Sequence, residues 1–433
     1  MVRKRRMEGM LADCNYRQSK SNEQHSSSKG TITVSARDEV IIAGGGIVGL
    51  ATAYQISQQY PHTKVTVLEK ESELGQHQTG RNSGVIHSGI YYTPGSLRAT
   101  NCQQGRRMME TFCREQEIPF DICGKVIVAV DELEQQRLQV IYERGQANTV
   151  ACKLLDQNQL SEIEPHTAGI AAIHVPDAGI VNFRTVCERL AEVVCERGGE
   201  IATSSKVLDI QQNTTGVNVE TSNGDFTGTY LINCTGIYCD RIAKKTGHRS
   251  PAKNVPFRGE YYELKPTAHH LCNHLIYPVP NPEFPFLGVH FTRMIDGRLE
   301  CGPNAVLAFA REGYRKRDVN VRDLLETFTY PGFLRLASKH WRMGMQEMWR
   351  SCSKRAFVKA LQRLVPAITA NDLMRGRSGV RAQALDPSGT LVDDFIILDS
   401  DRIINVCNAP SPAATSSLKI GETIVSRLGQ QFG

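Results

Sequence analysis

The sequence predicts an α/β fold. A short apolar run from Val40 to Ala43 is typical of a buried strand, and the glycine-rich segment from Gly44 to Gly49 follows it directly. Small residues from Leu50 to Tyr54 then open a helix, and a second apolar run from Val65 to Leu68 predicts the neighbouring strand. Strand, glycine turn, helix and strand in this order are typical of a Rossmann-like domain with parallel strands.

The glycines of the first turn, Gly44, Gly46 and Gly49, have the G-x-G-x-x-G spacing. They allow a tight turn, the approach of a pyrophosphate to the backbone, and close packing of helix on strand. The helix N-terminus also offers free N–H groups to phosphates. Glu69 follows the second strand about 20 residues after Gly49, where a carboxylate accepts the ribose hydroxyls of an adenosine. We therefore expect a dinucleotide, and the charge of Glu69 argues against NADP.

The rest of the chain favours FAD over NAD. Regular β-α units do not follow; instead Gly80 to Gly89 is a polar, glycine-rich loop unsuited to a buried strand. Far downstream come a helix from Val186 to Arg197 and a hairpin-like stretch from Val217 to Phe226. The strand after them starts at Tyr230 and ends on Thr235-Gly236, where a backbone can pass close to a nucleotide.

This middle section resembles that of the D-amino acid oxidase-like superfamily of FAD enzymes, and the resemblance extends from about residue 38 to the C-terminus. Four segments narrow it to one family, because their combination is similar to that of the L-2-hydroxyglutarate dehydrogenases. The segments are Gly80 to Tyr92 (GRNSGVIHSGIYY), Val255 to Leu264 (VPFRGEYYEL), Ser378 to Gln383 (SGVRAQ) and Asn408 to Leu418 (NAPSPAATSSL).

The resemblance implies a Rossmann-like FAD-binding domain interleaved with an α+β substrate domain on a mostly antiparallel sheet. The FAD-binding parts are expected at about 37–115, 175–250 and 370–433, and the substrate-domain parts at about 116–174 and 251–369. It also implies non-covalent FAD and oxidation of L-2-hydroxyglutarate to 2-oxoglutarate. Electrons would pass to an acceptor other than oxygen, such as a membrane quinone. Another hydroxy acid or amino acid substrate, or a flavin-binding scaffold without turnover, is the alternative.

Cofactor-binding residues are expected in each of these motifs. They are Gly44, Gly46, Gly49, Glu69, Lys70, Arg81, Asn82, Ser83, Thr235, Gly236, Ala413, Ala414 and Thr415. The last three open a helix that follows the strand from Ile403 to Cys407 and runs to Leu428. Its free N–H groups and dipole can stabilise the negative charge that grows at the flavin C2=O on reduction.

Arg381 is the first candidate for the substrate's α-carboxylate. The resemblance places it on the segment that returns from the substrate domain, and a planar guanidinium binds a carboxylate at two points. A structural ion pair with Asp386 or Asp393 is the alternative. Arg98 and Arg293 are both candidates for the distal carboxylate, and the sequence does not distinguish them.

Two histidines are candidates for the base that accepts the hydroxyl proton. His87 lies in the loop expected beside the flavin ring, and His290 lies in a substrate-domain strand, from Gly288 to Thr292. A histidine with its ordinary pKa of about 6.5 can act as a base at neutral pH. We expect His290 to be the base and His87 to donate a hydrogen bond to flavin or substrate. Each could instead be a structural histidine.

The segment from Phe257 to Tyr262 is expected to cross from the FAD domain to the substrate domain. Arg258 is expected to hold Glu260 or to stabilise the crossing, and Tyr262 is expected to line the substrate pocket. Each could serve packing alone.

A basic, aromatic stretch lies between Arg335 and Arg363. It holds eight Lys or Arg residues, one acid (Glu347) and both tryptophans of the chain, Trp341 and Trp349. Spacing predicts helices with one apolar and one basic face. They either cover the substrate pocket or form a peripheral surface for an anionic membrane, which would suit electron transfer to a quinone.

Composition limits the remaining classes. The formal net charge of +6 is modest for 433 residues, and no concentrated basic stripe predicts nucleic-acid binding. The thirteen cysteines show neither C-x-x-C pairs nor zinc spacing, so we expect reduced, mostly buried thiols and no metal site. Residues 1–36 are basic and rich in serine; they predict either a mitochondrial leader or a disordered tail.

Overall fold

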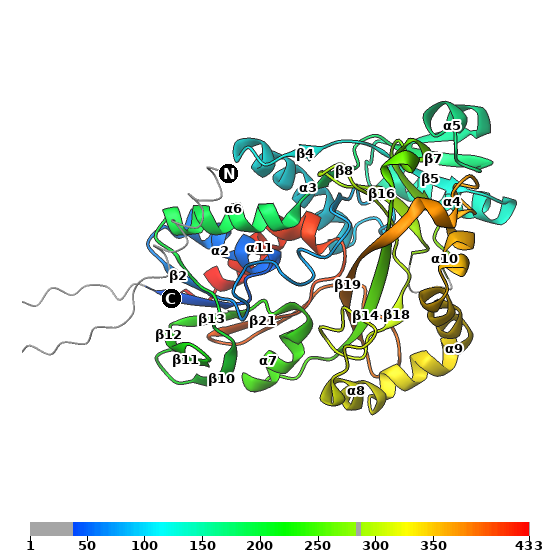
Figure 1. The fold of residues 1–433 in the computed structure, drawn as a ribbon. Helices are drawn as coiled ribbons and strands as arrows, with labels where there is room; N and C mark the ends of the chain where they lie inside the picture. Colours follow the sequence, from blue (N-terminus) through cyan, green and yellow to red (C-terminus); the bar gives the residue numbers. More distant parts are fainter. Residues whose placement is uncertain (1–37, 283–286, 433) are drawn as a thin grey trace, which may run out of the picture.

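The computed structural model describes residues 38–282 and 287–432. The leader expected at 1–36 lies outside them. Two large sheets organise the chain, one mostly parallel and one mostly antiparallel (Figure 1). The predicted α/β class, with a Rossmann-like part and a second part on a mostly antiparallel sheet, is confirmed.

The first sheet has the strand order β20-β21-β13-β1-β2-β9, and only β20 runs antiparallel to its neighbour. Its strands are β1 (Glu39–Ala43), β2 (Lys64–Leu68), β9 (Glu200–Ala202), β13 (Tyr230–Asn233), β20 (Ile396–Asp399) and β21 (Ile403–Asn408). The apolar runs that predicted β1, β2 and β13 are therefore adjacent strands. Parallel strands are buried on both faces, which is why these runs are continuously apolar.

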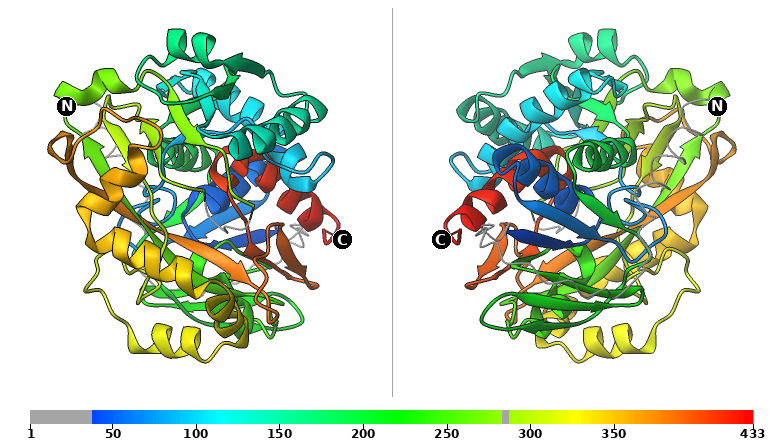
Figure 2. Two further views of the ribbon diagram at one scale, coloured as in Figure 1. Left: turned by 90° about the vertical axis from the view of Figure 1, so that its right-hand side faces the viewer. Right: turned by 90° about the vertical axis from the view of Figure 1, so that its left-hand side faces the viewer.

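Helices cover one face of this sheet and a small antiparallel layer covers the other (Figures 1 and 2). The helices are α2 (Ile47–Gln59), α3 (Leu97–Glu115), α6 (Phe183–Glu196) and α11 (Ala413–Gly429). The opposite layer consists of β10 (Val207–Gln212), β11 (Val217–Thr221), β12 (Gly224–Gly228) and α7 (Cys239–Lys245), which follows the 3-10 turn η1 (Gly236–Tyr238). The predicted hairpin is thus β11 and β12.

The second sheet has the order β18-β14-β17-β16-β15-β5-β7-β6, with β19 paired to β14. All its neighbours are antiparallel except β15 and β5. The strands are β5 (Lys125–Ala129), β6 (Lys153–Asp156), β7 (Ala171–Val175), β14 (Lys253–Leu264), β15 (Leu275–Pro278), β16 (His290–Arg293), β17 (Leu299–Gly302), β18 (Val306–Leu307) and β19 (Leu373–Leu385).

Helices surround this sheet. They are α4 (Glu132–Ala147), α5 (Gln157–Ile163), α8 (Val321–Phe328), α9 (Pro331–Cys352), α10 (Lys354–Leu361), η2 (Pro266–Leu271) and η3 (Ala370–Asp372). The long strands β14 and β19 pair along their length within this second sheet, on its side toward the first sheet (Figure 1). The cysteines among the described residues are free, and most are buried.

The loop between residues 80 and 89 departs from expectation at one point. Val85–Ile86 forms a short buried strand, β3, which pairs with β8 (Gly179–Val181), and β8 also pairs with β4 (Phe120–Asp121). Two apolar residues between glycines and polar residues do not predict a strand from the sequence. They form one here because they pair with β8, a partner distant in the sequence.

Candidate active site

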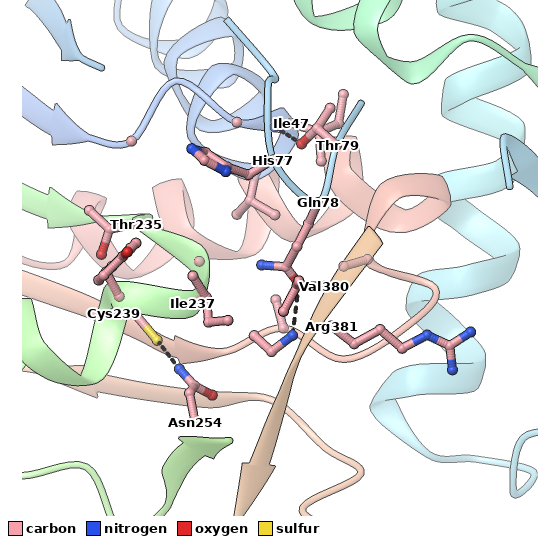
Figure 3. Close-up of a pocket in the computed structure, with 18 of the residues that line it drawn as sticks. Ile47, His77, Gln78, Thr79, Thr235, Ile237, Cys239, Asn254, Val380 and Arg381 are labelled. Carbon is pink, nitrogen blue, oxygen red and sulfur yellow. Dashed lines mark hydrogen bonds between the residues drawn. The ribbon is translucent and has the colours of Figure 1, made fainter. Parts of the chain in front are cut away.

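A cavity of about 1460 Å³ lies between the two sheets. It is lined by the Gly44 turn, the loop around Arg81, the start of α11, and parts of β14 and β19 (Figure 3). Ligand pockets for drug-sized molecules are typically about 300–1,000 Å³, so this cavity has room for a larger ligand. One continuous cavity therefore joins the predicted nucleotide end to the predicted substrate end.

The glycine turn is shaped to admit a phosphate group. Gly44 has φ +112°, and a Cβ there would lie 2.4 Å from the carbonyl oxygen of Cys234. A Cβ on Gly49 would lie 2.0 Å from the Gly44 oxygen, so α2 packs directly against the turn. Gly46 caps α2 without a side-chain hydrogen bond. The helix N-terminus thus faces the cavity with its dipole and part of its N–H groups available, which fits the pyrophosphate of FAD.

Glu69 lies at the carboxyl end of β2 and lines the cavity. Its oxygens accept hydrogen bonds from the backbone N–H groups of Gly45 (2.9 Å) and Glu71 (3.0 Å). These bonds fix the carboxylate, and each oxygen keeps a lone pair for a ribose hydroxyl. Lys70 lines the cavity too, but its ammonium is held by Glu71 and by Glu312 (2.5 Å).

The loop after β2 is held by its own polar side chains. The Asn82 amide donates to the oxygens of Gln78 (3.0 Å) and Thr79 (2.7 Å), and its oxygen accepts from Gly84 N (2.8 Å). Asn82 therefore shapes the loop. Arg81 stacks on Tyr314, with its guanidinium 4.1 Å from the ring centroid.

Arg377 also supports this loop, and the sequence did not predict this role. It donates to the carbonyl oxygens of Gly80 (3.0 Å) and Asn82 (2.8 Å), and to the buried Glu300 carboxylate (2.8 Å). It thereby connects β19 and β17 to the loop. No sequence signal marks it among the arginines of its segment, since its partners are distant backbone atoms.

Two further segments border the same cavity. Thr235 follows β13, and its hydroxyl and N–H both donate to Asn233 (2.7 and 3.2 Å). Gly236, with φ +56°, begins η1. Figure 3 shows Thr235, Ile237 and Cys239 on one side of the cavity. The side-chain amide of Asn254 donates a hydrogen bond to Sγ of Cys239.

Helix α11 begins at the cavity, as predicted. Pro412 precedes it, and no side chain caps its first N–H groups. Ala413, Ala414 and Thr415 line the cavity. The Thr415 hydroxyl accepts from His87 N (3.1 Å) and donates to Val85 O (3.2 Å), so the helix start is joined to the loop that carries His87.

His290 and His87 both line the cavity, and their surroundings keep both rings neutral. Burial lowers the pKa of His290 to about 3, and Arg381 and Lys125 contribute. Burial also lowers the pKa of His87 to about 3, with Lys125 as the largest charge effect. The expectation of an ordinary pKa was therefore wrong, because the sequence shows neither the burial nor the neighbouring cations.

The ring of His290 is well oriented. It stacks on Tyr277 with centroids 4.1 Å apart, and Nδ1 lies 3.0 Å from the carbonyl oxygen of Gly288. A carbonyl only accepts, so Nδ1 carries the hydrogen and Nε2 is left as a proton acceptor. This is the tautomer that a general base requires.

Arg381 lies on β19 opposite Phe257 and lines the cavity (Figure 3). It is close to the Tyr261 hydroxyl. Within residues 38–282 and 287–432 no carboxylate forms an ion pair with it. Asp386 instead accepts from Ser388 and Thr390. The alternative of a structural ion pair for Arg381 is therefore not supported.

Three further arginines that the sequence singled out lie in different surroundings. Arg98 lines the cavity and donates to Ser411 O (2.7 Å), whereas Arg293 is exposed and donates to Asn273 O (2.7 Å). Arg258 donates to Glu260 (3.1 Å), as one reading predicted.

Tyr262 packs on Phe357 rather than lining the cavity, and Tyr261 lines it instead. Successive side chains of a strand point to opposite faces, so Gly259 and Tyr261 share the cavity side of β14. Tyr277 was also missed, because its strand shows no motif.

Comparison with known proteins gives one family. The model of the FAD-dependent oxidoreductases matches residues 39–427. An L-2-hydroxyglutarate dehydrogenase of Indibacter alkaliphilus is 51% identical over 388 residues, covering 89% of this chain and 97% of that protein. A mitochondrial L-2-hydroxyglutarate dehydrogenase of Nematostella vectensis is 45% identical over 422 residues, covering 93% and 92%.

Solved structures agree on the fold. L-alpha-glycerophosphate oxidase from Mycoplasma pneumoniae, with FAD bound, superposes with a TM-score of 0.75 at 23% identity, covering 91% of this chain and 95% of that one. Glycine oxidase from Geobacillus kaustophilus gives 0.70 at 17% identity, covering 92% and 96%.

Proposed function

Because this chain belongs to the FAD-dependent oxidoreductases and, within them, to the L-2-hydroxyglutarate dehydrogenase family, we propose that it oxidises L-2-hydroxyglutarate to 2-oxoglutarate. FAD is its cofactor, and the residues present fit it. The glycine turn suits the pyrophosphate, Glu69 suits the ribose, and the uncapped start of α11 suits the flavin.

The reaction moves a hydride from Cα and a proton from the hydroxyl group. FAD, when bound, supplies the hydride acceptor. The chain positions the substrate: Arg381 binds the α-carboxylate, and Nε2 of His290 accepts the hydroxyl proton. His87 lies on the same wall and hydrogen-bonds substrate or flavin. Both rings are neutral and can therefore accept a proton, and the negative charge of a bound carboxylate substrate raises the pKa of His290 from its low value in the empty site.

The two ends of the cavity give the strongest support for the proposal. A single cavity holds, at one end, a turn and helix start suited to a dinucleotide and, at the other, an arginine without a carboxylate partner among the described residues beside two neutral histidines. A carboxylic acid bearing an oxidisable hydroxyl group matches this second end.

A substrate screen with an artificial dye acceptor tests the proposal. We expect L-2-hydroxyglutarate to be turned over at least tenfold faster than L-malate, glycerol 3-phosphate or any amino acid. Preference for one of those would assign the chain to another activity of the superfamily. No turnover of any hydroxy acid by FAD-loaded protein would favour the flavin-binding scaffold.

We further propose that the electrons pass to a membrane quinone and that the chain contacts the membrane peripherally. No helix among the described residues is long and apolar enough to cross a bilayer. On α9, however, Trp341 and Trp349 are 60% and 67% exposed. Arg342 is exposed beside Trp341, and Arg335 and Lys339 are exposed on the part of α9 before its kink at His340. Tryptophan beside basic residues favours an anionic lipid surface.

The alternative interpretation of this stretch, a cover for the substrate pocket, is not supported, because no residue of 335–363 lines the cavity.

Vesicle flotation tests this contact. The protein should float with anionic vesicles at low salt, less at high salt, and not with neutral vesicles. Replacing Trp341 and Trp349 with serine should abolish flotation. The matched control is Leu133→Ser, since Leu133 is 56% exposed on α4, outside this surface. Equal flotation of all variants, or none by the unchanged chain, contradicts the proposal.

A mitochondrial location is the third part of the proposal. It is supported by the basic leader at 1–36 and by the mitochondrial animal relative. Fractionation of cells expressing the full chain tests it, and a location outside mitochondria would contradict it.

A further inference from the structure

Lys125, the first residue of β5, carries a buried positive charge that the proposed reaction does not yet use. Its side chain is 1% exposed. The ammonium lies between two aromatic rings, 4.8 Å from the centroid of Tyr91 and 5.0 Å from that of Tyr277. Over residues 38–282 and 287–432, no carboxylate forms an ion pair with Lys125. A buried cation normally has such a partner.

Burial lowers the pKa of Lys125 to about 8, so the amine is still mostly protonated at neutral pH. The aromatic faces stabilise the cation in part. The buried hydroxyl of Tyr91, beside which Lys125 lies, also has no hydrogen-bond partner in the described structure. The unpaired buried ammonium attracts an anion that binds on the far side of these rings.

The cation lies directly behind the wall of the cavity. Tyr277 covers the ammonium and stacks on His290, and both line the cavity. Lys125 is also the strongest charge acting on His87, which lines the same wall. Together with Arg381, the site therefore has two cations without carboxylate partners among the described residues.

We propose that Lys125 is a specificity-determining residue, whose charge behind the His87–Tyr277–His290 wall attracts the second carboxylate of a dicarboxylic substrate. The inference rests on the proposed function and extends it from a hydroxy acid to a recognised diacid. Arg381 binds the carboxylate next to the reacting carbon, and Lys125 acts on the distal one. Its charge acts through one layer of side chains, so no direct contact is required.

Binding of two unreactive acids to the FAD-loaded protein tests the proposal. Glutarate carries two carboxylates and butyrate one, and the change in flavin absorbance reports each Kd. Across one layer of side chains the two charges lie roughly 8 Å apart, and a full charge at that distance changes affinity by about 30-fold at an effective dielectric constant of about 20. Lys125→Met should therefore weaken glutarate binding about 30-fold and butyrate binding less than about fivefold. Lys125→Arg, which keeps the charge, should retain glutarate binding to within about fivefold.

Equal weakening of both acids in Lys125→Met would show a merely structural role and overturn the proposal, as would unchanged glutarate binding. The dye assay keeps the two claims separate. Failure of the unchanged chain to oxidise L-2-hydroxyglutarate would overturn the proposed function. Normal oxidation with an unaltered glutarate-to-butyrate ratio in Lys125→Met would overturn this inference alone.

The unchanged protein offers a second test if Lys125→Met does not fold. The titratable groups around Lys125 are His87, Tyr91, Cys102, Tyr277 and His290, and the charges of Arg98 and Arg381 act on the neighbouring His87. The histidine pKa values lie at about 3, that of Cys102 at about 12, and burial raises those of both tyrosines. Of these groups Lys125 alone titrates near pH 8. The Kd of glutarate should rise as pH exceeds about 8, while that of butyrate stays nearly constant. Parallel curves would contradict the proposal.

Discussion

Arg381 and the two histidines bring opposite requirements into one cavity. In the proposed reaction the arginine binds an anionic substrate, whereas a histidine that accepts the proton must be neutral. The protein meets both requirements by burial, since the cations and the low polarity of the wall disfavour a further positive charge. The chemistry therefore depends on where the rings lie as much as on which residues they are.

Replacing Arg381 with alanine tests its role. We expect kcat/KM for L-2-hydroxyglutarate to fall roughly 10²–10³-fold or more, because a charge-assisted pair with the carboxylate is lost. Steady-state kinetics on protein with normal FAD content measure it. A near-normal kcat/KM would remove Arg381 from the site.

The pH dependence of stability tests the state of His290. Its folded pKa of about 3 lies below the unfolded value of about 6.5, so the unfolded chain binds more protons between these values. The free energy of unfolding should therefore rise with pH from about 3 to about 6.5, by up to about 1.4 kcal/mol per pH unit from this group. Urea unfolding at several pH values should show a flatter profile for His290→Gln. Identical slopes would contradict the neutral, buried state.

At the scale of elements, the sequence predicted what depends on local pattern. The first strand, the glycine turn, α2 and the start of α11 all follow from apolar runs and small residues. What depends on distant partners was not visible. The choice of Tyr261 over Tyr262 follows from the strand register against β19, and no motif distinguishes Lys125, which opens the apolar strand β5.

The packing of α2 on the glycine turn gives a prediction at this scale. A Cβ on Gly49 would lie 2.0 Å from the Gly44 oxygen, so the turn must move in Gly49→Ala. We expect at least a tenfold loss of FAD affinity, since the N–H groups that face the pyrophosphate move with it. Flavin fluorescence after dialysis measures the loss. Gly344→Ala in α9, where a Cβ meets nothing within 4 Å, is the control and should bind FAD normally.

At the scale of the whole molecule, residues of both sheets line one cavity, and the long paired strands β14 and β19 of the second sheet border it. This arrangement brings residues distant in the chain, from Gly44 to Thr415, around the same ligand. The two-sheet organisation was predictable through the family resemblance. The paired positions of Lys125 and Arg381 were not, because only the assembled sheets place their charges around a common space.

Anaerobic mixing of the FAD-loaded protein with L- and D-2-hydroxyglutarate tests the central claim most directly. Without an electron acceptor, oxidation of the substrate leaves the flavin reduced. The flavin absorbance at its visible maximum, roughly 450 nm, then falls. The L-form should bleach the flavin rapidly, and the D-form should leave it oxidised. Absence of bleaching by the L-form, or equal bleaching by both, would contradict the proposed function.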